Sequence, residues 1–425
     1  MEQTPVAGVD VSKRFSDMCI LSPSNKVFAK TKIYHDLISM QKSLEPLHQA
    51  ESMFGAKPVI VMESTSHYHL LLCQFMRRAG YEVIVINPIQ SSALHNITVR
   101  KVKNDKVDAY HIAMLYRMKL LRSSVIPDEM LNELRALCRQ HCEVKQDITR
   151  YANRLTALLD QSFPGYDTIF ARISGMSSLA VLARYPSAQA ILQAPAEELS
   201  QLIYDTSRKG RKYSNEKTAR LKKIAAAATK FGILHSSNDT LVQTVVATLQ
   251  LFFANVDAID LKMEEIINGE PHIKENILLL QTIPGMGQYS SVVIRAEIGN
   301  FSAFEKPKQL TAFFGLDPSV NQSGTFQGTK NKISKRGTRY ARGVLHMVAH
   351  NSVHPHCNGE IGNPVLADYY QKKLSCKPAK VALCAVMHKI VNIIFAVLRD
   401  QKPFELRNPE EHARKLREHH IPTAA

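Results

Sequence analysis

The sequence has no paired cysteine motif, no long apolar run and fewer acidic than basic residues. Its seven cysteines are scattered, odd in number and include no CxxC, which argues against a disulfide framework and favours a reducing setting. The amino terminus lacks the basic and then apolar layout of a signal peptide. The longest apolar candidate, residues 390–398, falls short of the roughly 18 to 20 residues that span a bilayer. We therefore expect a soluble cytoplasmic protein without a membrane partner.

The shortage of acids leaves a strong positive charge. Lys and Arg total 54 against 38 Asp and Glu, which gives a formal net charge of +16. This excess favours a polyanionic partner, because neutralised phosphates release counterions and supply affinity that does not depend on sequence. A basic protein with no nucleic-acid role is the alternative at this point. With 425 residues, 45% of them hydrophobic, the chain is expected to form two or three domains.

Residues 1–122 alternate between strand-like and helix-like patterns. Strands are predicted at residues 5–12, 17–23, 26–34, 58–63 and 82–86, and helices at about 38–54 and 67–80. The run PVIVME at 58–63 is apolar throughout and ends in an acid, as expected for a buried central strand. Strands alternating with helices predict an α/β sheet that is covered on both faces.

A heptad pattern follows, with apolar residues at alternating steps of four and three. The members of this seam are Met130, Leu134, Leu137, His141, Val144, Ile148, Tyr151, Leu155 and Leu158. The pattern predicts a long helix packed against a partner helix. The partner belongs either to a second subunit or to a later part of this chain, where residues 242–267 resume an apolar helical pattern.

The rest of the chain is predicted to be mostly helical. A basic stretch at residues 207–223, SRKGRKYSNEKTARLKK, is either a solvated helix face or a direct nucleic-acid contact. A third region begins near Leu278 and closes with an apolar helix at about 380–398. These patterns divide the chain into residues 1–122, 128–270, 275–400 and a polar, basic tail at 401–425.

Four acids form the first candidate site. Asp10 lies on the first predicted strand, Glu63 ends the strand at 58–63, and Asp105 and Asp108 share one face at the start of a later helix. This set is typical of ribonuclease H-like nucleases, which hold two divalent metal ions. Carboxylate oxygens suit Mg²⁺, and paired ions can activate the attacking oxygen and stabilise the leaving one in phosphoryl transfer. Taken singly, each acid has a structural alternative, such as a helix cap at Asp105.

A serine loop forms the second candidate site. Ser323 is flanked by Gln322 and Gly324, and a basic patch follows: Lys330, Lys332, Lys335, Arg336, Arg339 and Arg342. A serine in a glycine-containing loop beside several cations can attack a DNA phosphate while the cations stabilise the developing charge. On composition alone, a loop that only contacts phosphate is the alternative.

The third candidate is the IPGMG turn at residues 283–287, between two apolar helical segments. A glycine-rich turn before a helix can bind a DNA phosphate through backbone N–H groups, which would involve Gly285 and Gly287. The pattern resembles a helix-hairpin-helix element. A plain corner between two helices is the structural alternative.

Together these motifs resemble the DEDD-type insertion-sequence transposases, a family related to the Piv DNA invertases and known for RNA-bridged recombination. The likeness is carried by GVDVSK, VMESTSHYH, VINP and KNDKVDA at the front, and by TIPGMG, EIGNF, LTAFFGLDPSVNQSG and ISKRGTRYAR at the back. It implies a RuvC or RNase H-like α/β domain, a helical coiled-coil middle, and a mostly α carboxy-terminal transposase domain with a helix-hairpin-helix-like element.

The resemblance also implies roles for residues and partners. Asp10, Glu63, Asp105 and Asp108 would be the tetrad that binds Mg²⁺, two ions per site, and Ser323 would form a covalent link to DNA. The implied partners are DNA, a bridge RNA encoded by the element, and further copies of the chain in a dimer or tetramer, at the prokaryotic nucleoid. The middle, about 160–270, is longer than in compact members, so no role follows for it. The alternatives are a Holliday-junction-type metal nuclease without serine catalysis and a non-catalytic nucleic-acid scaffold.

Overall fold

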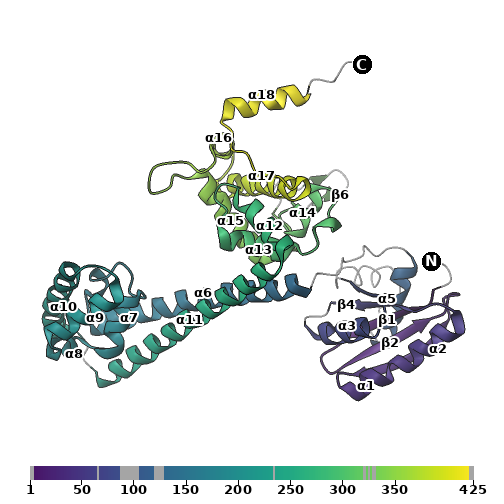
Figure 1. Cartoon of the computed structure of the whole chain (residues 1–425), viewed down its shortest axis with the longest axis horizontal. Coiled ribbons are helices and arrows are strands. Elements are labelled where there is room, and N and C mark those ends of the chain that lie inside the picture. Colours follow the sequence, from purple (N-terminus) through teal and green to yellow (C-terminus); the bar gives the residue numbers. More distant parts are fainter. Residues whose placement is uncertain are drawn as a thin grey trace. The chain divides into compact units, whose positions relative to one another are not determined.

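The computed structural model describes residues 4–64, 67–86, 105–118, 129–232, 235–318, 322–323, 326–327 and 332–420. The chain forms two compact units (Figure 1). The first comprises Met1–Asp128 with Asn300–Ala303, and the second comprises Glu129–Gly299 with Phe304–Ala425. The expected separation of residues 128–270 from 275–400 stays a prediction.

The amino-terminal unit is built on a mixed five-stranded sheet. Its strands are β1 (Val6–Val11), β2 (Phe15–Leu21), β3 (Val27–Tyr34), β4 (Val59–Glu63) and β5 (Val83–Ile86). Their order is β3-β2-β1-β4-β5. The first three strands are antiparallel neighbours, whereas β4 runs parallel to both β1 and β5. All five predicted strands are therefore present, within two residues of their expected ends.

Both faces of this sheet are covered, as the sequence predicted. One face packs against α1 (Leu37–Lys42), α2 (Leu44–Phe54) and α3 (Tyr68–Arg78). The other face packs against α5 (Asp105–Arg117). The single helix expected at 38–54 is broken at Ser43, because Pro46 is tolerated only in the first turn of a helix and forces a new helix to begin.

Two long helices dominate the first half of the second unit. α6 (Glu129–Ser162) and α11 (Ser236–Gly269) have 34 residues each. They are antiparallel, since Cys138 contacts Met263 near one end and Tyr151 contacts Phe252 further along. The partner of the predicted seam is therefore a later part of the same chain. Supercoiling of the pair into a coiled coil stays a prediction.

The buried face of α6 is wider than the predicted seam. Leu134, His141, Val144, Ile148 and Leu155 are buried as expected. Toward the two ends of the helix, the seam residues Met130, Leu137 and Leu158 are only partly buried. The residue that follows each of them is buried instead: Leu131, Cys138 and Leu159. The reason at the amino-terminal end is a second neighbour, since α6 also packs there against α13 (Gln288–Ile298).

A small helical bundle joins the far ends of α6 and α11. Its elements are the short turn Tyr166–Thr168, α7 (Met176–Arg184), α8 (Ala188–Gln193), α9 (Ala196–Ser207) and α10 (Arg211–Phe231). Large side chains such as Phe163 and Tyr166 are almost fully buried in the core that the bundle shares with the two long helices. We call residues 165–232 the tip bundle.

The rest of the second unit is a helical body. It contains α12 (Pro271–Gln281), α13, α14 (Pro307–Phe313), α15 (Arg339–Val353), α16 (Pro364–Leu374), α17 (Ala379–Asp400) and α18 (Pro409–His420), with the short strands β6 (Gln322–Ser323) and β7 (Phe326–Gln327). The short turn Phe301–Ala303 is assigned to the first unit. Part of the expected tail is thus helical, as α18.

Two helices are long and apolar enough to cross a membrane by length and composition, α17 and Ser237–Gly269 of α11. The expectation that no stretch reaches this length was wrong, because it stopped at the charged residues Lys389 and Arg399. The apolar side chains of α17 pack against α12, α14, α15 and α16. The central helix of a soluble helical body has these same properties.

Candidate active site

The first group of candidate residues lies at the carboxyl ends of two parallel strands. β1 pairs with β4 through Val9 and Met62, and Asp10 and Glu63 are the next residues on each strand. Side chains alternate along a strand, so both acids point to the face opposite Val9 and Met62, which is the face that α5 covers. Both carboxylates are half-buried.

The helix α5 brings a third acid to the same end. Arg117, its last residue, donates to Thr4 O just before β1, and the backbone at Ala109 touches Gly8 further along the strand. The helix therefore runs antiparallel to β1 and its first turn lies toward Asp10. Asp108 precedes buried Ala109 by one residue and is half-buried. Asp10, Glu63 and Asp108 thus lie toward one end and one face of the sheet.

Gly8 permits the close approach of α5. A Cβ atom at this position would lie 2.1 Å from Ala109 O and 2.6 Å from Ala113 N. Both are backbone atoms, which cannot turn away as a flexible side chain can. The glycine of the GVDVSK motif therefore sets the spacing between β1 and the helix that carries Asp108.

The sequence did not identify Asp17 as a further acid of this group. Asp17 on β2 is the direct cross-strand partner of Asp10, and directly opposed like charges are destabilising in a sheet. A cation shared between the two would offset that repulsion. The strands predicted at 5–12 and 17–23 are separated by a short turn, and pairing them as a hairpin could have identified Asp17.

The four predicted acids do not all lie within the described side chains. The side chain of Asp105 falls outside them, although its backbone begins α5. Among the described residues, no group of three or more His, Cys, Asp or Glu side chains gathers closely enough to hold a metal ion. The donor chemistry nevertheless fits a hard divalent cation, since carboxylate oxygens are its preferred ligands.

The second candidate site is a β-hairpin. Ser323 pairs with Phe326, and two residues separate β6 from β7. The side chain of Ser323 lies outside the described residues, as does Lys330. Toward the base of the hairpin, Pro318 and Ile333 form an isolated bridge. The loop expected around the serine therefore contains a short antiparallel pair, and Ser323 is the last residue of β6.

A backbone clamp closes the base of this hairpin. Ser334 N donates to Asp317 O at 2.8 Å, and Lys335 N donates to Gly315 O at 3.0 Å. Gly337 is required there, because a Cβ atom would lie 1.8 Å from Phe313 O. The clamp thus joins the FFGLDP and ISKRG segments, which stand about 20 residues apart in the sequence.

Arg342 takes part in this clamp. Its Nη1 atom donates to Phe314 O at 3.1 Å and to Gly337 O at 2.6 Å. Burial lowers the pKa of the Arg342 guanidinium. These contacts give Arg342 a structural part that the sequence did not reveal, and its contact with nucleic acid stays a prediction.

The remaining described cations of the basic patch differ in their surroundings. Lys332, Lys335 and Arg336 are exposed. Arg339 donates to Glu143 on α6 at 3.0 Å, and Tyr340 donates to the same carboxylate at 2.6 Å. Arg339 therefore helps to attach α15 to α6.

The two glycines of the IPGMG turn also have different surroundings. A Cβ atom on Gly285 would lie 2.7 Å from Ser352 Oγ, and Ser352 Oγ donates to Pro284 O at 2.8 Å. Gly285 therefore allows the turn to pack on α15. Gly287 is exposed, precedes α13 and has open space where a Cβ atom would stand. Of the two, Gly287 is the one whose position would allow a phosphate to approach a helix amino terminus.

The EIGNF motif has a packing role. Glu297 is 2% exposed and accepts from Arg139 at 2.7 and 2.9 Å. Arg135 donates to Ala296 O at 2.9 Å, and burial lowers its pKa. These contacts fix α13 to α6. Because Glu297 is buried whereas Arg139 is partly exposed, removing Arg139 is the costly change, since it leaves a buried carboxylate without its hydrogen-bond partner.

A mixed sheet carries acids at one strand end, and a second unit carries a clamped serine hairpin followed by cations, an arrangement that suits a protein acting on nucleic acid. A transposase family model matches residues 7–164, and a model of the transposase IS116/IS110/IS902 family matches residues 278–371. The chain belongs to this family of insertion-sequence transposases. It is therefore an enzyme of DNA strand cleavage and transfer.

Individual relatives agree with this assignment. An uncharacterized 43.6 kDa protein of insertion element IS110 from Streptomyces coelicolor is 23% identical over 95% of this chain and 96% of its own length. The putative mini-circle transposase for IS117 of the same species is 26% identical, over 80% of this chain and 84% of its own length. A pilin gene-inverting protein of Moraxella bovis is 28% identical over 36% of this chain and 46% of its own length.

Proposed function

We propose that this transposase cleaves DNA with Ser323 as nucleophile and with a divalent metal site formed by Asp10, Glu63, Asp105 and Asp108. The observation that carries the metal site is the position of three of these acids toward one end and one face of the sheet. Bound Mg²⁺ would supply charge stabilisation and acidify an oxygen. The four acids and the serine lie in different units, so their meeting on one phosphate is part of the proposal.

The serine step is a transesterification. Ser323 Oγ forms a bond to phosphorus, the bond from phosphorus to one deoxyribose oxygen breaks, and the serine proton ends on the freed hydroxyl. In the reverse sense, a DNA hydroxyl attacks the phosphoserine and restores the serine. A serine hydroxyl is a weak nucleophile at neutral pH and needs a base and charge stabilisation. A carboxylate of the acidic group would accept the proton, and Lys335 and Arg336 would stabilise the phosphate.

The test for the nucleophile is a denaturing gel with labelled DNA, followed by mass spectrometry of the shifted band. Wild-type protein should give a DNA adduct at Ser323. Ser323→Ala should lose the adduct and strand cleavage while keeping DNA binding, and the exposed control Ser375→Ala should keep all three. Efficient cleavage by Ser323→Ala with free DNA ends would identify the chain as a metal nuclease without serine catalysis.

The test for the acids uses single amide variants. Asp10→Asn, Glu63→Gln, Asp105→Asn and Asp108→Asn should each abolish recombination at unchanged soluble yield, because an amide cannot replace a carboxylate ligand. Glu45→Gln, on the exposed first turn of α2, is the matched control. Wild-type rates for two of the four site variants would refute the metal assignment.

Two partners complete the proposal, a bridge RNA encoded by the element and a second copy of the chain. A net charge of +16 exceeds what a short DNA footprint requires and leaves charge for a second polyanion. Recombination by RNA-free protein on bare DNA would refute the requirement for a bridge RNA. If the site forms between copies, a mixture of Asp10→Asn and Ser323→Ala proteins should recover activity. If the mixture recovers no activity and the protein has a monomeric mass in solution, the proposal of an oligomer is refuted.

A further inference from the structure

One exposed side of α10 carries a row of cations that the proposed chemistry does not use. Lys212, Arg220, Lys223 and Lys230 are all exposed. At about 100° per residue their spacing keeps them within about 80° of one another around the helix. The other exposed positions between Lys212 and Lys230 are three alanines, Asn215 and Glu216, and Glu216 is the single acid among residues 208–223 against eight Lys and Arg. We call these four cations the α10 row.

Other cations of the same helix are used in folding. Lys217 donates to Ile169 O, and Lys222 donates to Ala194 O and to Leu192 O. Within the part of the chain that the structure describes, members of the α10 row make no such hydrogen bond and no ion pair. The exposed acid Glu216 lies on the same helix side, between Lys212 and Arg220, and offsets one of the four charges. The remaining net positive charge of this side is neutralised by a polyanion.

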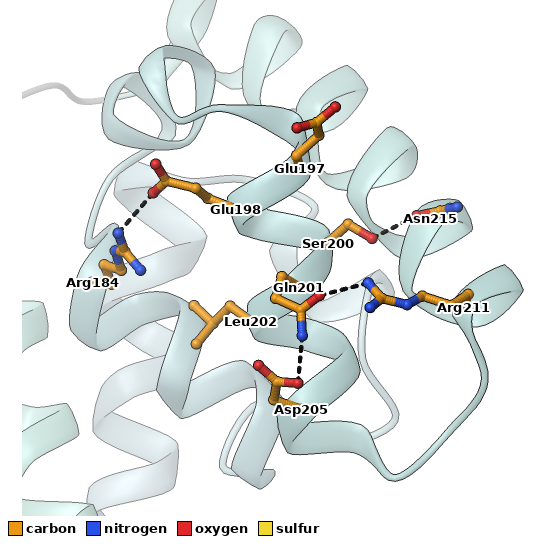
Figure 2. A pocket seen from close by; sticks show the side chains of 9 residues that line it. All are labelled: Arg184, Glu197, Glu198, Ser200, Gln201, Leu202, Asp205, Arg211 and Asn215. Carbon is orange, nitrogen blue, oxygen red and sulfur yellow. Dashed lines mark hydrogen bonds and ion pairs between the residues drawn. The ribbon is translucent and has the colours of Figure 1, made fainter.

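The groove beside α10 does not take this role. It lies between α9 and α10, and Figure 2 shows its side chains bonded to one another. Arg184 binds Glu198, and Gln201 bridges Asp205 and Arg211. Arg211 also lies 4.2 Å from the centre of the Tyr204 ring. Most polar groups of the groove therefore satisfy one another, and Arg211 bonds to α9 instead of facing outward with the α10 row.

The α10 row is separate from both transposase segments. It falls between the matched residues 7–164 and 278–371. Within the second unit, the tip bundle lies at the end of the α6–α11 pair away from α13 (Figure 1). From Lys212 to Lys230 the row extends about 27 Å, at 1.5 Å per residue. A DNA duplex of roughly eight base pairs has this length and offers a phosphate charge about every 1.7 Å.

We propose that the α10 row binds the phosphate backbone of duplex DNA, as a sequence-independent contact outside the catalytic segments. A paired backbone is favoured over unpaired bases, because stacking of successive bases needs several exposed rings and α10 has one strongly exposed ring, Phe231, which follows Lys230 at the end of the helix and is 69% exposed. Tyr213, the aromatic residue of this part of α10, is only partly exposed and lies beneath Lys209 and Lys217. This contact does not depend on the serine chemistry proposed above.

The test compares two charge-matched variants of the full chain. The row variant carries Lys212→Gln, Arg220→Gln, Lys223→Gln and Lys230→Gln. The control carries Lys262→Gln, Lys274→Gln, Lys372→Gln and Lys402→Gln, which are exposed cations outside α10. Fluorescence anisotropy with a labelled 40-base-pair DNA duplex is recorded at several KCl concentrations in EDTA, in a Ser323→Ala background. Cleavage therefore plays no part, and a failure of the serine mechanism cannot affect the result.

The row variant should bind duplex DNA at least tenfold more weakly near 0.1 M salt. The slope of log affinity against log salt should fall by up to about 0.9 for each lost phosphate contact. The control should keep nearly the wild-type slope. Equal slopes for both variants would overturn the proposal, and so would a loss confined to a structured RNA of equal length.

A second measurement needs no substitution. Acetylation of lysines in wild-type protein, quantified by mass spectrometry with and without the duplex, should show protection at Lys212, Lys223 and Lys230. Lys262 and Lys372 should be modified at the same rate in both samples. Unprotected lysines on α10 at saturating DNA would refute the contact, even if the row variant had folded poorly.

Discussion

The two candidate sites differ in what holds them in place. The acids are positioned by regular structure: the register of β1 and β4 and the approach of α5 to Gly8. The serine hairpin is positioned by irregular backbone, through a clamp of carbonyl and amide groups around Gly315, Gly337 and Arg342. A site on regular elements depends on the stability of its whole unit, whereas a clamped hairpin can lose its geometry while the surrounding fold persists.

The largest effect is expected from Gly8→Val. Its side chain would collide with backbone atoms of α5, so the first unit should lose at least about 3 kcal/mol of stability together with all activity. Thermal unfolding of the full chain measures the first effect and a recombination assay the second. The control is Gly343→Ala, an exposed helical glycine with open space at the Cβ position, which should be neutral or stabilising. A wild-type melting curve for Gly8→Val would show that α5 does not pack on β1 as described.

The matching change in the clamp is Gly337→Ala. The new Cβ atom would displace Phe313 O, at a cost of about 1 to 3 kcal/mol. Covalent adduct formation should fall at least tenfold while the amino-terminal unit melts as in wild type. Differential scanning calorimetry and the adduct gel report these two quantities. If Gly337→Ala lowers the melting temperatures of both units together, the two sites do not differ in what holds them in place.

A smaller effect should separate Arg342 from Arg336. Arg342→Gln removes two hydrogen bonds to backbone carbonyls, so it should lower the melting temperature and change the salt slope of DNA binding less than Arg336→Gln does. Arg336→Gln removes an exposed cation, so it should keep the melting temperature and reduce the slope by about 0.9. The opposite pattern would assign the phosphate contact to Arg342 and the clamp to Arg336.

The smallest effect concerns Lys335, which has a positive φ of 54°. A non-glycine residue in this region is strained by about 1 kcal/mol, so Lys335→Gly should raise stability by up to that amount. Lys335→Ala loses the same charge and keeps the strain, which makes it the control. If both variants melt alike, the clamp does not hold residue 335 in this conformation.

The sequence predicted the regular parts of the fold well. Short β-rich segments and two continuous apolar runs located all five strands of the first sheet, the heptad seam located α6, and the apolar pattern at 242–267 located its partner α11. It did not predict burial of Leu131 and Cys138, because a heptad describes one neighbouring helix and α6 has two. It also missed the break at Ser43, which depends on Pro46 in the next turn.

The candidate acids could be chosen from their places on strands and helices, and the structure brings three of them toward one sheet end. Asp17 was missed because cross-strand pairing depends on register, which apolar alternation does not report. The clamp around Gly337 was missed for a different reason. Its bonds join backbone atoms, so side-chain patterns carry little information about them. The resemblance to transposases supplied Ser323, whereas composition left a phosphate-contacting loop open.

The length of the paired helices α6 and α11 sets the distance between the helical body and the tip bundle within the second unit. Each has 34 residues, or about 50 Å at 1.5 Å per residue. Inserting seven residues into both helices at facing positions would keep the apolar seam in phase and move the tip bundle outward by about 10 Å. On duplex DNA that displacement is about three base pairs, at roughly 3.4 Å each. The length of this helix pair would then determine how far from the reacting phosphate the α10 row can bind, and so the length of DNA that one chain protects.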